Sequence, residues 1–327
     1  MSNFLFLGVN LLFMRKALLV LFISAQALMA SAQRYIAYEN MIGTEELRET
    51  LEYLADDMAA GRASGTDGKL YAEQFIRERF RNYGLKPFNW NFTQSFPYRD
   101  SIMVRNVIGV VPANNMSDEY IIVGAHYDHL GILGGKTFNG ADDNASGVTA
   151  LLCMARLFAK MRAEGEGPGK NIIFVAYDGK ELDMYGSEYF VNNLPFPAEK
   201  IACAVNIDML GTTLAPVHRN RPDYLIVLGE ETLPKSMQGA ISRCNASLRF
   251  GMDIDYSFYG SPAFTDMMYR TSDQYSFSKK KIPSLLFTSA FNDHTYKSTD
   301  TIDIIDFKML QKRTALLFDI IYRYSIL

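Results

Sequence analysis

The sequence predicts an α/β fold, a three-layer sandwich in which a central mixed, largely parallel sheet is flanked by helices. Two observations support this fold class. Short apolar runs alternate along the chain with longer segments whose apolar residues have helical spacing. The runs at 120–125 and 171–177 are apolar almost throughout, as is typical of parallel strands buried on both faces. Such an alternation favours strands that are joined by helices packed on the sheet.

The helices and strands follow from these patterns in chain order. Two helices are predicted within 44–84, the first from Leu47, Leu51, Leu54 and Met58, with a glycine-rich turn at 61–68 between them. The remaining elements are strands at 92–98, 104–111, 120–125, 171–177, 201–208, 224–228 and 284–288, and helices at 146–163, from 185 to 192 and at 307–324.

Composition and charge limit the classes of function. The chain has 327 residues, of which 48% are hydrophobic and 13% aromatic, and these proportions argue for a globular protein and against disorder. The net charge is −3, and no basic stripe is present, so nucleic acid is excluded as a partner. An odd number of cysteines without metal spacing argues for buried thiols: Cys153, Cys203 and Cys244.

The N-terminus has the pattern of a secretion signal. The basic pair Arg15-Lys16 precedes an apolar segment at 17–28, and Ala30-Ser31-Ala32 fits the small-residue rule for cleavage before Gln33. The first 13 residues are also apolar, so translation starts at either Met1 or Met14.

This pattern predicts the domain organisation and the location of the protein. We expect a signal peptide at 1–32 and a single domain at 33–327. The alternative is an uncleaved membrane anchor, but the apolar segment after Lys16 is short for a membrane span. The expected protein is therefore secreted or periplasmic, with no stable membrane insertion after the signal is cleaved.

Histidines and aspartates gather directly after the strand predicted at 120–125. His126, Asp128 and His129 come first, and Asp142 and Asp143 follow within twenty residues. Divalent cations such as zinc accept this mixture of imidazole and carboxylate ligands. Asp128 is placed to accept a hydrogen bond from His126 and so to orient its ring. The alternative is a polar loop that caps a helix, because Asp-Asn-Ala-Ser is also good N-cap chemistry.

Other polar residues follow other predicted strands. The segment 178–181 follows the strand at 171–177, Asp208 ends the strand at 201–208, and a further polar segment follows Thr288. Binding sites of open α/β sheets form at the carboxyl ends of their strands. Because these residues are predicted to meet at one edge of the sheet, a metal site is favoured over a capping loop.

The motifs resemble those of the co-catalytic di-zinc aminopeptidases, a family that also contains glutamate carboxypeptidases and glutaminyl cyclases. The two motifs are Gly-Ala-His-Tyr-Asp-His-Leu-Gly at 124–131 and Gly-Ala-Asp-Asp-Asn-Ala-Ser-Gly at 140–147. The resemblance extends from the segment at 61–66 to Asp300-Thr301. It implies a zinc-exopeptidase-like fold, two bound zinc ions, and peptides as substrates.

The resemblance also implies a role for each ligand. In this family a glutamate takes a proton from a metal-bridging water, which then attacks a peptide carbonyl that two metal ions polarise. The implied ligands are His126 and Asp208 on one metal, Glu181 on the other and Asp143 on both, with Asp128 orienting His126.

Lys180 departs from the family at the position of the general base. The family has Glu-Glu where this chain has Lys180-Glu181, and an ordinary lysine, with a pKa of about 10.4, is protonated at neutral pH. Three alternatives follow. Lys180 turns outward and is structural, or it acts as an unusual neutral base because two dications lower its pKa. In the third alternative another carboxylate, Asp178 or Asp183, takes the role.

The second departure lies in the loop after the last strand. The family has a histidine ligand there, and the matching position in this chain is Tyr296. His294 lies two residues earlier and, on an extended segment, points to the same side, so it is a candidate ligand in a shifted register. A plain surface histidine is the alternative. Tyr296 either binds metal as a phenolate or donates a hydrogen bond to the oxyanion, and His129 is expected to be solvated or to support the ligands from outside.

These observations favour a secreted zinc-dependent exopeptidase of the aminopeptidase type, which removes N-terminal residues from peptides and prefers apolar ones. Lys180 and Tyr296 keep two alternatives open. One is a family member that binds a peptide or a metal without turnover, and the other is an acyl transferase like the glutaminyl cyclases. The sequence leaves open the substrate specificity, the oligomeric state, and the number and identity of the bound metals.

Overall fold

The computed structural model describes residues 22, 38–99, 102–216, 220–246 and 250–327. The predicted signal peptide at 1–32 therefore lies outside the described residues, apart from Phe22. The chain divides into two units, residues 1–41 and 42–327. The described part of the first unit beyond Phe22 is residues 38–41, where Tyr38 and Glu39 are helical. The account that follows concerns the second unit.

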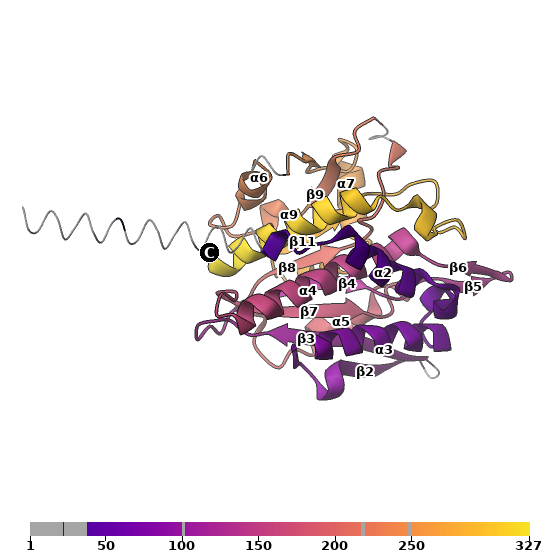
Figure 1. Cartoon of the computed structure of the whole chain (residues 1–327), viewed down its shortest axis with the longest axis horizontal. Helices are drawn as coiled ribbons and strands as arrows, with labels where there is room; N and C mark the ends of the chain where they lie inside the picture. The colour runs from indigo at the N-terminus through magenta and orange to yellow at the C-terminus, as the bar shows by residue number, and fades with distance from the viewer. Residues whose placement is uncertain (1–21, 23–37, 100–101, 217–219, 247–249) are drawn as a thin grey trace, which may run out of the picture. The chain divides into compact units, whose positions relative to one another are not determined.

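A mixed sheet runs through the middle of the second unit (Figure 1). Its strands are β1 (Lys86–Pro87), β2 (Thr93–Tyr98), β3 (Ile102–Val111), β4 (Tyr120–His126), β7 (Asn171–Tyr177), β8 (Ile201–Ile207), β9 (Tyr224–Leu228), β10 (Asp253–Asp255) and β11 (Ser284–Thr288). Their order is β1-β3-β7-β4-β8-β11-β9-β10, and β2 also pairs with β3. A separate hairpin consists of β5 (Gly131–Leu133) and β6 (Lys136–Phe138).

The central strands are parallel and the outer pairs are mainly antiparallel. β4 is parallel to β7 and β8, and β8 is parallel to β11. β3 is antiparallel to β7, and β9 is antiparallel to β11. Ile121, Ile122 and Val123 of β4 are fully buried. Because successive side chains of a strand point to opposite faces of the sheet, both faces are covered at β4. The prediction of a mixed, largely parallel sheet is confirmed.

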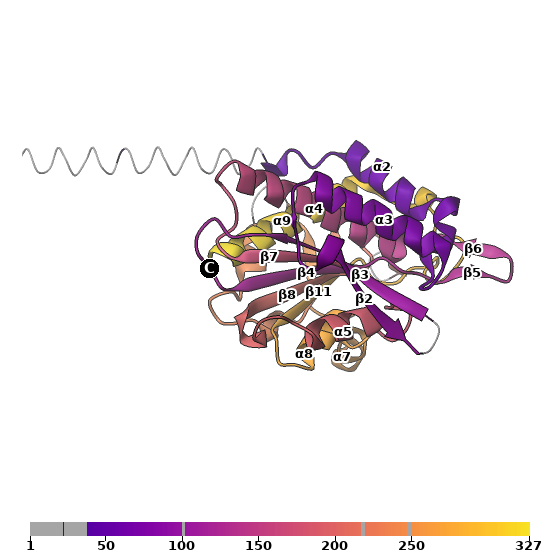
Figure 2. The same ribbon diagram turned by 90° about the horizontal axis from the view of Figure 1, so that it is seen from below.

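Helices cover both faces of the sheet. The helices are α2 (Thr44–Ala55), α3 (Asp67–Asn82), α4 (Gly147–Ala163), α5 (Tyr185–Asn192), α6 (Ala240–Asn245), α7 (Pro262–Tyr269), α8 (Gln274–Ser278) and α9 (Phe307–Ile326). Figure 2 shows α2, α3, α4 and α9 on one side of the sheet and α5, α7 and α8 on the other. The predicted three-layer sandwich is therefore confirmed.

The prediction for the first helix is wrong at its C-terminal end, where the helix is shorter than expected. α2 ends at Ala55, and Met58 lies in a short 3-10 segment, η1 (Asp57–Arg62), where its side chain is 71% exposed. Positive φ angles at Ala60 and Gly61 interrupt the helical path there. A Cβ atom on Gly61 would lie 2.5 Å from the carbonyl oxygen of Gly131, so the chain passes too closely for any side chain. Several short elements were not predicted, because they are too short to show a periodicity: β5, β6, β10, α6, α7 and α8.

Two expectations from composition can be compared with the described residues. All three cysteines are buried and free, as predicted. None of the helices in the described part of the chain is both long and apolar enough to cross a bilayer.

Candidate metal centre

The ends of the central strands bring polar residues from distant parts of the chain to one edge of the sheet. His126 is the last residue of β4 and lies in register with Tyr177, the last residue of β7. The segment 178–181 therefore starts beside His126. β8 lies on the other side of β4, and Asp208 directly follows it. The convergence predicted from the strand ends is present.

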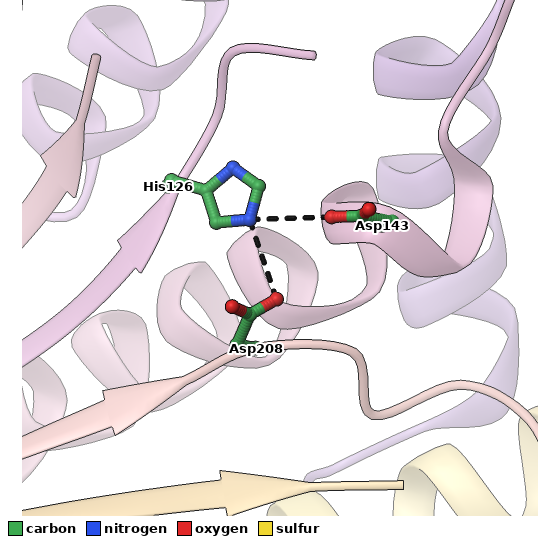
Figure 3. A group of neighbouring side chains, drawn as sticks. All are labelled: His126, Asp143 and Asp208. Carbon is green, nitrogen blue, oxygen red and sulfur yellow. Dashed lines mark hydrogen bonds and ion pairs between the residues drawn. The ribbon is translucent and has the colours of Figure 1, made fainter. Parts of the chain in front are cut away.

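The first cluster consists of His126, Asp143 and Asp208, all of them buried (Figure 3). Nε2 of His126 lies 3.3 Å from Oδ1 of Asp143 and 3.3 Å from Oδ1 of Asp208. Burial lowers the pKa of His126, but the carboxylates around it outweigh burial and raise the pKa well above its usual value. Two carboxylates at one ring nitrogen require a positive charge, which a proton or a metal ion supplies.

Asp128 holds the other side of His126 and the loop beyond β7. Nδ1 of His126 lies 3.0 Å from the backbone oxygen of Asp128 and 3.7 Å from its carboxylate. A proton on Nδ1, donated to that carbonyl, leaves Nε2 available to a cation. The carboxylate of Asp128 accepts the backbone N–H groups of Lys180 and Glu181, at 3.1 Å each. Asp128 therefore contacts His126 through its backbone oxygen and, at a longer distance, through the carboxylate that the sequence suggested.

The second cluster consists of His129, Asp143 and Glu181. Nδ1 of His129 lies 3.9 Å from Oδ2 of Asp143 and 3.9 Å from Oε1 of Glu181. Burial lowers the pKa of His129 to about 4, and burial raises that of Glu181 to about 7. Asp143 belongs to both clusters and offers a different oxygen to each, an arrangement suited to a bridging ligand.

The size and chemistry of both clusters fit metal ions. Zinc ligands lie about 2.0–2.2 Å from the ion, so two ligand atoms of a tetrahedral site are about 3.4 Å apart. The corresponding pairs here are 3.3 to 3.9 Å apart. Both ring nitrogens of His129 and both oxygens of Asp143 are buried without a hydrogen-bond partner among the described residues. Buried polar atoms are seldom left without partners, and an ion in each cluster would satisfy Nδ1 of His129 and both oxygens of Asp143.

Buried hydrogen bonds hold the segment that carries Asp143. This segment is a turn of π-helix, η3 (Ala141–Ser146), of a kind that is frequent at functional sites. The carboxylate of Asp300 accepts the backbone N–H groups of Asp142 and Asp143, at 2.8 and 3.0 Å. The buried Arg62 donates to the carbonyl oxygens of Asn139 and Gly140, at 2.5 and 2.9 Å. These contacts fix Asp143 and the chain directly before it.

A model of peptidase family M28 matches residues 106–321, which is more than half of the chain. The chain belongs to peptidase family M28. The resemblance inferred from its motifs is thereby confirmed.

Individual relatives of this M28 family member include a probable leucine aminopeptidase 1 from Trichophyton verrucosum. It is 25% identical over 67% of the present chain, which spans only 58% of the length of that relative. Among solved structures, the zinc aminopeptidase BSAP of Bacillus subtilis aligns over 86% of this chain and 95% of its own, with a TM-score of 0.67 and 14% identity. Glutaminyl cyclase from Porphyromonas gingivalis aligns over 86% and 97%, with a TM-score of 0.66 and 19% identity. These two structures share the fold.

In this M28 family member Lys180 faces the clusters. Its Nζ lies 3.1 Å from Oε1 of Glu181 and 3.8 Å from Oδ1 of Asp143, and its side chain is 7% exposed. The alternative of an outward, structural lysine is therefore wrong. Burial lowers the pKa of Lys180, but Asp143, Asp208 and Glu181 outweigh burial and raise the pKa well above its usual value.

The other carboxylates considered as substitutes for the base lie outside both clusters. Asp178 is buried and engaged by Nζ of Lys69 at 3.0 Å and by the hydroxyl of Ser64 at 2.6 Å. Asp183 is exposed. Neither Asp178 nor Asp183 therefore belongs to the clusters, and nothing in their positions supports them as the base.

The loop after β11 presents Tyr296 and not His294. The hydroxyl of Tyr296 accepts a hydrogen bond from Nζ of Lys180 at 3.2 Å, and its ring is parallel to that of His129, with centroids 6.5 Å apart. Nδ1 of His294 lies 3.0 Å from the hydroxyl of Thr299, and His294 belongs to neither cluster. The sequence prediction left His129 outside the ligands, as a solvated or supporting residue, whereas the structure buries it in the second cluster. A signal was available, since only four histidines occur in the chain and His129 lies three residues after His126.

Proposed function

We propose that this chain is an exported zinc-dependent exopeptidase of the aminopeptidase type, which hydrolyses N-terminal residues from peptides. One observation carries the proposal: two clusters of metal-binding side chains share Asp143, which offers one oxygen to each. Paired metal ions held in this way are suited to the hydrolysis of a peptide bond. The names of the leucine aminopeptidase relative and of the Bacillus zinc aminopeptidase support the same activity.

Different residues of the chain have different roles in the proposed site. Bound zinc would supply Lewis acidity at the substrate carbonyl and at a water molecule. His126, Asp143, Glu181 and Asp208 would hold the ions, since their ligand atoms face one another in buried positions. Asp128 keeps the loop of Glu181 in place through two backbone hydrogen bonds.

Lys180 and Tyr296 are proposed as hydrogen-bond donors and not as a base. Their polar atoms are 3.2 Å apart and lie at the edge of the clusters. An ammonium and a hydroxyl in this position can donate to the oxygen that becomes negative when the carbonyl is attacked. Because the glutamate of the family is absent at 180, we expect slow turnover.

A small cavity beside the clusters is lined partly by apolar side chains and supports a preference for apolar residues. Its walls include Lys180 and Tyr296 on the side of the clusters, and its apolar lining is Met209, Phe258, Met268, Leu286 and Phe291. The cavity holds about 20 Å³, which is enough for about one water molecule. We therefore expect small apolar N-terminal residues to be preferred, since a large one requires an aromatic side chain to move.

The function is tested by hydrolysis of alanine and leucine p-nitroanilides with the purified chain 33–327. Chelation should abolish the activity and zinc should restore it. Glu181→Ala should lower kcat/KM at least 100-fold, because it removes a ligand of the second cluster. Glu188→Ala is the matched control, since Glu188 forms an exposed ion pair with Lys279 and should leave the rate unchanged.

Other results would identify the alternatives. Peptide binding without turnover would indicate a binding protein instead of a peptidase. The ammonium of Lys180 beside the clusters favours this alternative. Formation of a pyroglutamyl product from a peptide with N-terminal glutamine would indicate cyclase chemistry, for which the similarity in fold to the Porphyromonas enzyme is the supporting observation. Unchanged activity in Glu181→Ala would overturn the proposed site.

Export is tested separately. When the full chain is expressed in a bacterial host, we expect the mature protein outside the cytoplasm with Gln33 as its first residue. N-terminal sequencing of the exported fraction checks the cleavage site, and an intact N-terminus in the membrane fraction would indicate an anchor instead.

A further inference from the structure

The second cluster contains a histidine from an unexpected part of the chain. The sequence resemblance implies that the second imidazole ligand comes from the loop after β11. In this chain that loop presents the phenol of Tyr296, while His294 contacts Thr299 and lies outside the clusters. An imidazole is nevertheless present in the second cluster, and it belongs to His129 in the segment after β4.

The environment of His129 indicates a missing ligand. Its side chain is fully buried, and neither ring nitrogen has a hydrogen-bond partner among the described residues. An unpartnered imidazole nitrogen in a buried position is unfavourable unless something unseen satisfies it. Nδ1 faces carboxylate oxygens of Asp143 and Glu181, at 3.9 Å each, and both oxygens of Asp143 also lack partners among those residues. A cation between these three groups would satisfy Nδ1 of His129 and the facing carboxylate oxygens of Asp143 and Glu181.

The surrounding chain is shaped to hold the ring of His129. The backbone N–H of His129 donates to the carbonyl oxygen of Arg62, and the guanidinium of Arg62 donates in turn to the carbonyl of Tyr127. Gly140, with φ of +57°, lies against the ring, and a Cβ atom there would be 2.6 Å from Cδ2 of His129. The lack of a side chain at Gly140 leaves the space that the imidazole occupies.

We propose that His129 is the imidazole ligand of the second metal ion, together with Asp143 and Glu181, in place of a histidine from the loop after β11. This inference rests on the metal sites of the proposed function but not on turnover. The loop after β11 then has no metal ligand, and Tyr296 remains available, with Lys180, to contact the substrate.

The inference is tested by counting metal ions. The wild-type chain 33–327, His129→Gln and His294→Gln are each equilibrated with excess zinc, passed over a desalting column, and analysed by elemental mass spectrometry. We expect two, one and two zinc ions per chain, respectively. Circular dichroism checks that each variant is folded, and His294→Gln is the matched control because it removes an imidazole from the loop after β11.

The outcomes are decisive whether or not the protein is a peptidase. Fewer than two ions in the wild type, two ions in His129→Gln, or the loss of one ion from His294→Gln would overturn the inference. The expected counts without hydrolysis would leave the inference standing and remove only the proposed function. If the wild type hydrolyses peptides but His294→Gln loses one zinc ion, the proposed function would stand and the inference would be overturned.

A second measurement covers the case in which His129→Gln does not fold. In the wild-type protein labelled with 15N-histidine, zinc should shift the ring resonances of two histidines and leave those of His294 unchanged. His294→Gln assigns the His294 signals, and a zinc-dependent shift of these signals would overturn the inference.

Discussion

Lys180 brings a positive charge into a site that is otherwise built from carboxylates and imidazoles. At its distances of 3.1 and 3.8 Å from Glu181 and Asp143, unit charges interact by about 4–5 kcal/mol at an effective dielectric constant of about 20. The same charge repels a dication bound by these two carboxylates. Lys180 therefore competes with the second metal ion and also lacks the proton-accepting group that the family has at this position.

Lys180→Glu is expected to raise kcat for peptide hydrolysis at least tenfold at saturating zinc. The substitution removes the repulsive charge and adds a carboxylate that can accept a proton, and general-base catalysis typically contributes 10²- to 10⁴-fold. Steady-state rates with an aminoacyl p-nitroanilide measure the effect.

Two further variants separate the causes. Lys180→Gln removes only the charge and should give a smaller gain in kcat. Lys308→Glu makes the same change at an exposed position of α9 and should have no effect. An unchanged or lower rate in Lys180→Glu would show that the residue at 180 does not limit activity.

At the scale of the elements, a buried ion cluster joins α3 to the end of β7. Nζ of Lys69 lies 3.0 Å from Asp178 and 3.3 Å from Glu73, and the side chains of Lys69 and Asp178 are fully buried. Asp178 is followed after one residue by Lys180-Glu181. The cluster therefore anchors the start of the loop that carries both residues into the site.

Lys69→Met is expected to lower the free energy of unfolding by about 3–5 kcal/mol, because it leaves the carboxylate of Asp178 buried without its cation. Urea denaturation followed by circular dichroism measures the change. The control is Lys160→Met, which breaks an exposed pair with Glu164 and should change the stability by less than about 1 kcal/mol. Equal effects of the two variants would contradict a structural role for the buried cluster.

At the scale of the whole molecule, the metal centre ties together segments that meet only in the folded state. Its residues end or follow β4, follow β7 and β8, or lie in η3, so the site spans more than eighty residues of sequence. Metal binding should therefore stabilise the fold, since ions that bind only the native state shift the unfolding equilibrium.

Removal of zinc with a chelator is expected to lower the Tm by roughly 5–10 °C. An ion present at 100 times its Kd adds about 2.7 kcal/mol, and each kcal/mol shifts the Tm of a large domain by roughly 2–4 °C. Differential scanning fluorimetry with and without chelator measures the shift. Asp143→Asn, which removes the shared charge, should show little response to the chelator, and a full response in that variant would argue against Asp143 as the bridging ligand.

The sequence by itself determined the fold class and the edge of the sheet at which polar residues gather. Alternating apolar patterns determine which segments become strands and helices, and strands buried on both faces must be central in the sheet. The positions of His126 and Asp208 follow, because both lie at the ends of such strands. The exposure of Met58 was not predictable, because a turn with positive φ interrupts the helical path there. Short helices such as α8 were not predictable, because they are too short to show a periodicity.

Only the tertiary structure decided where individual side chains point. Lys180 could not be placed from the sequence, because its direction depends on a loop that the carboxylate of Asp128, 52 residues earlier, holds through hydrogen bonds. Which of His129 and His294 lies near the carboxylates also depends on contacts between distant segments. His129 joins Glu181 because β4 and β7 are neighbours in the sheet, whereas a local hydrogen bond to Thr299 holds His294 away. Residue types and strand ends follow from local pattern, but ligand geometry depends on contacts between segments that are distant in sequence.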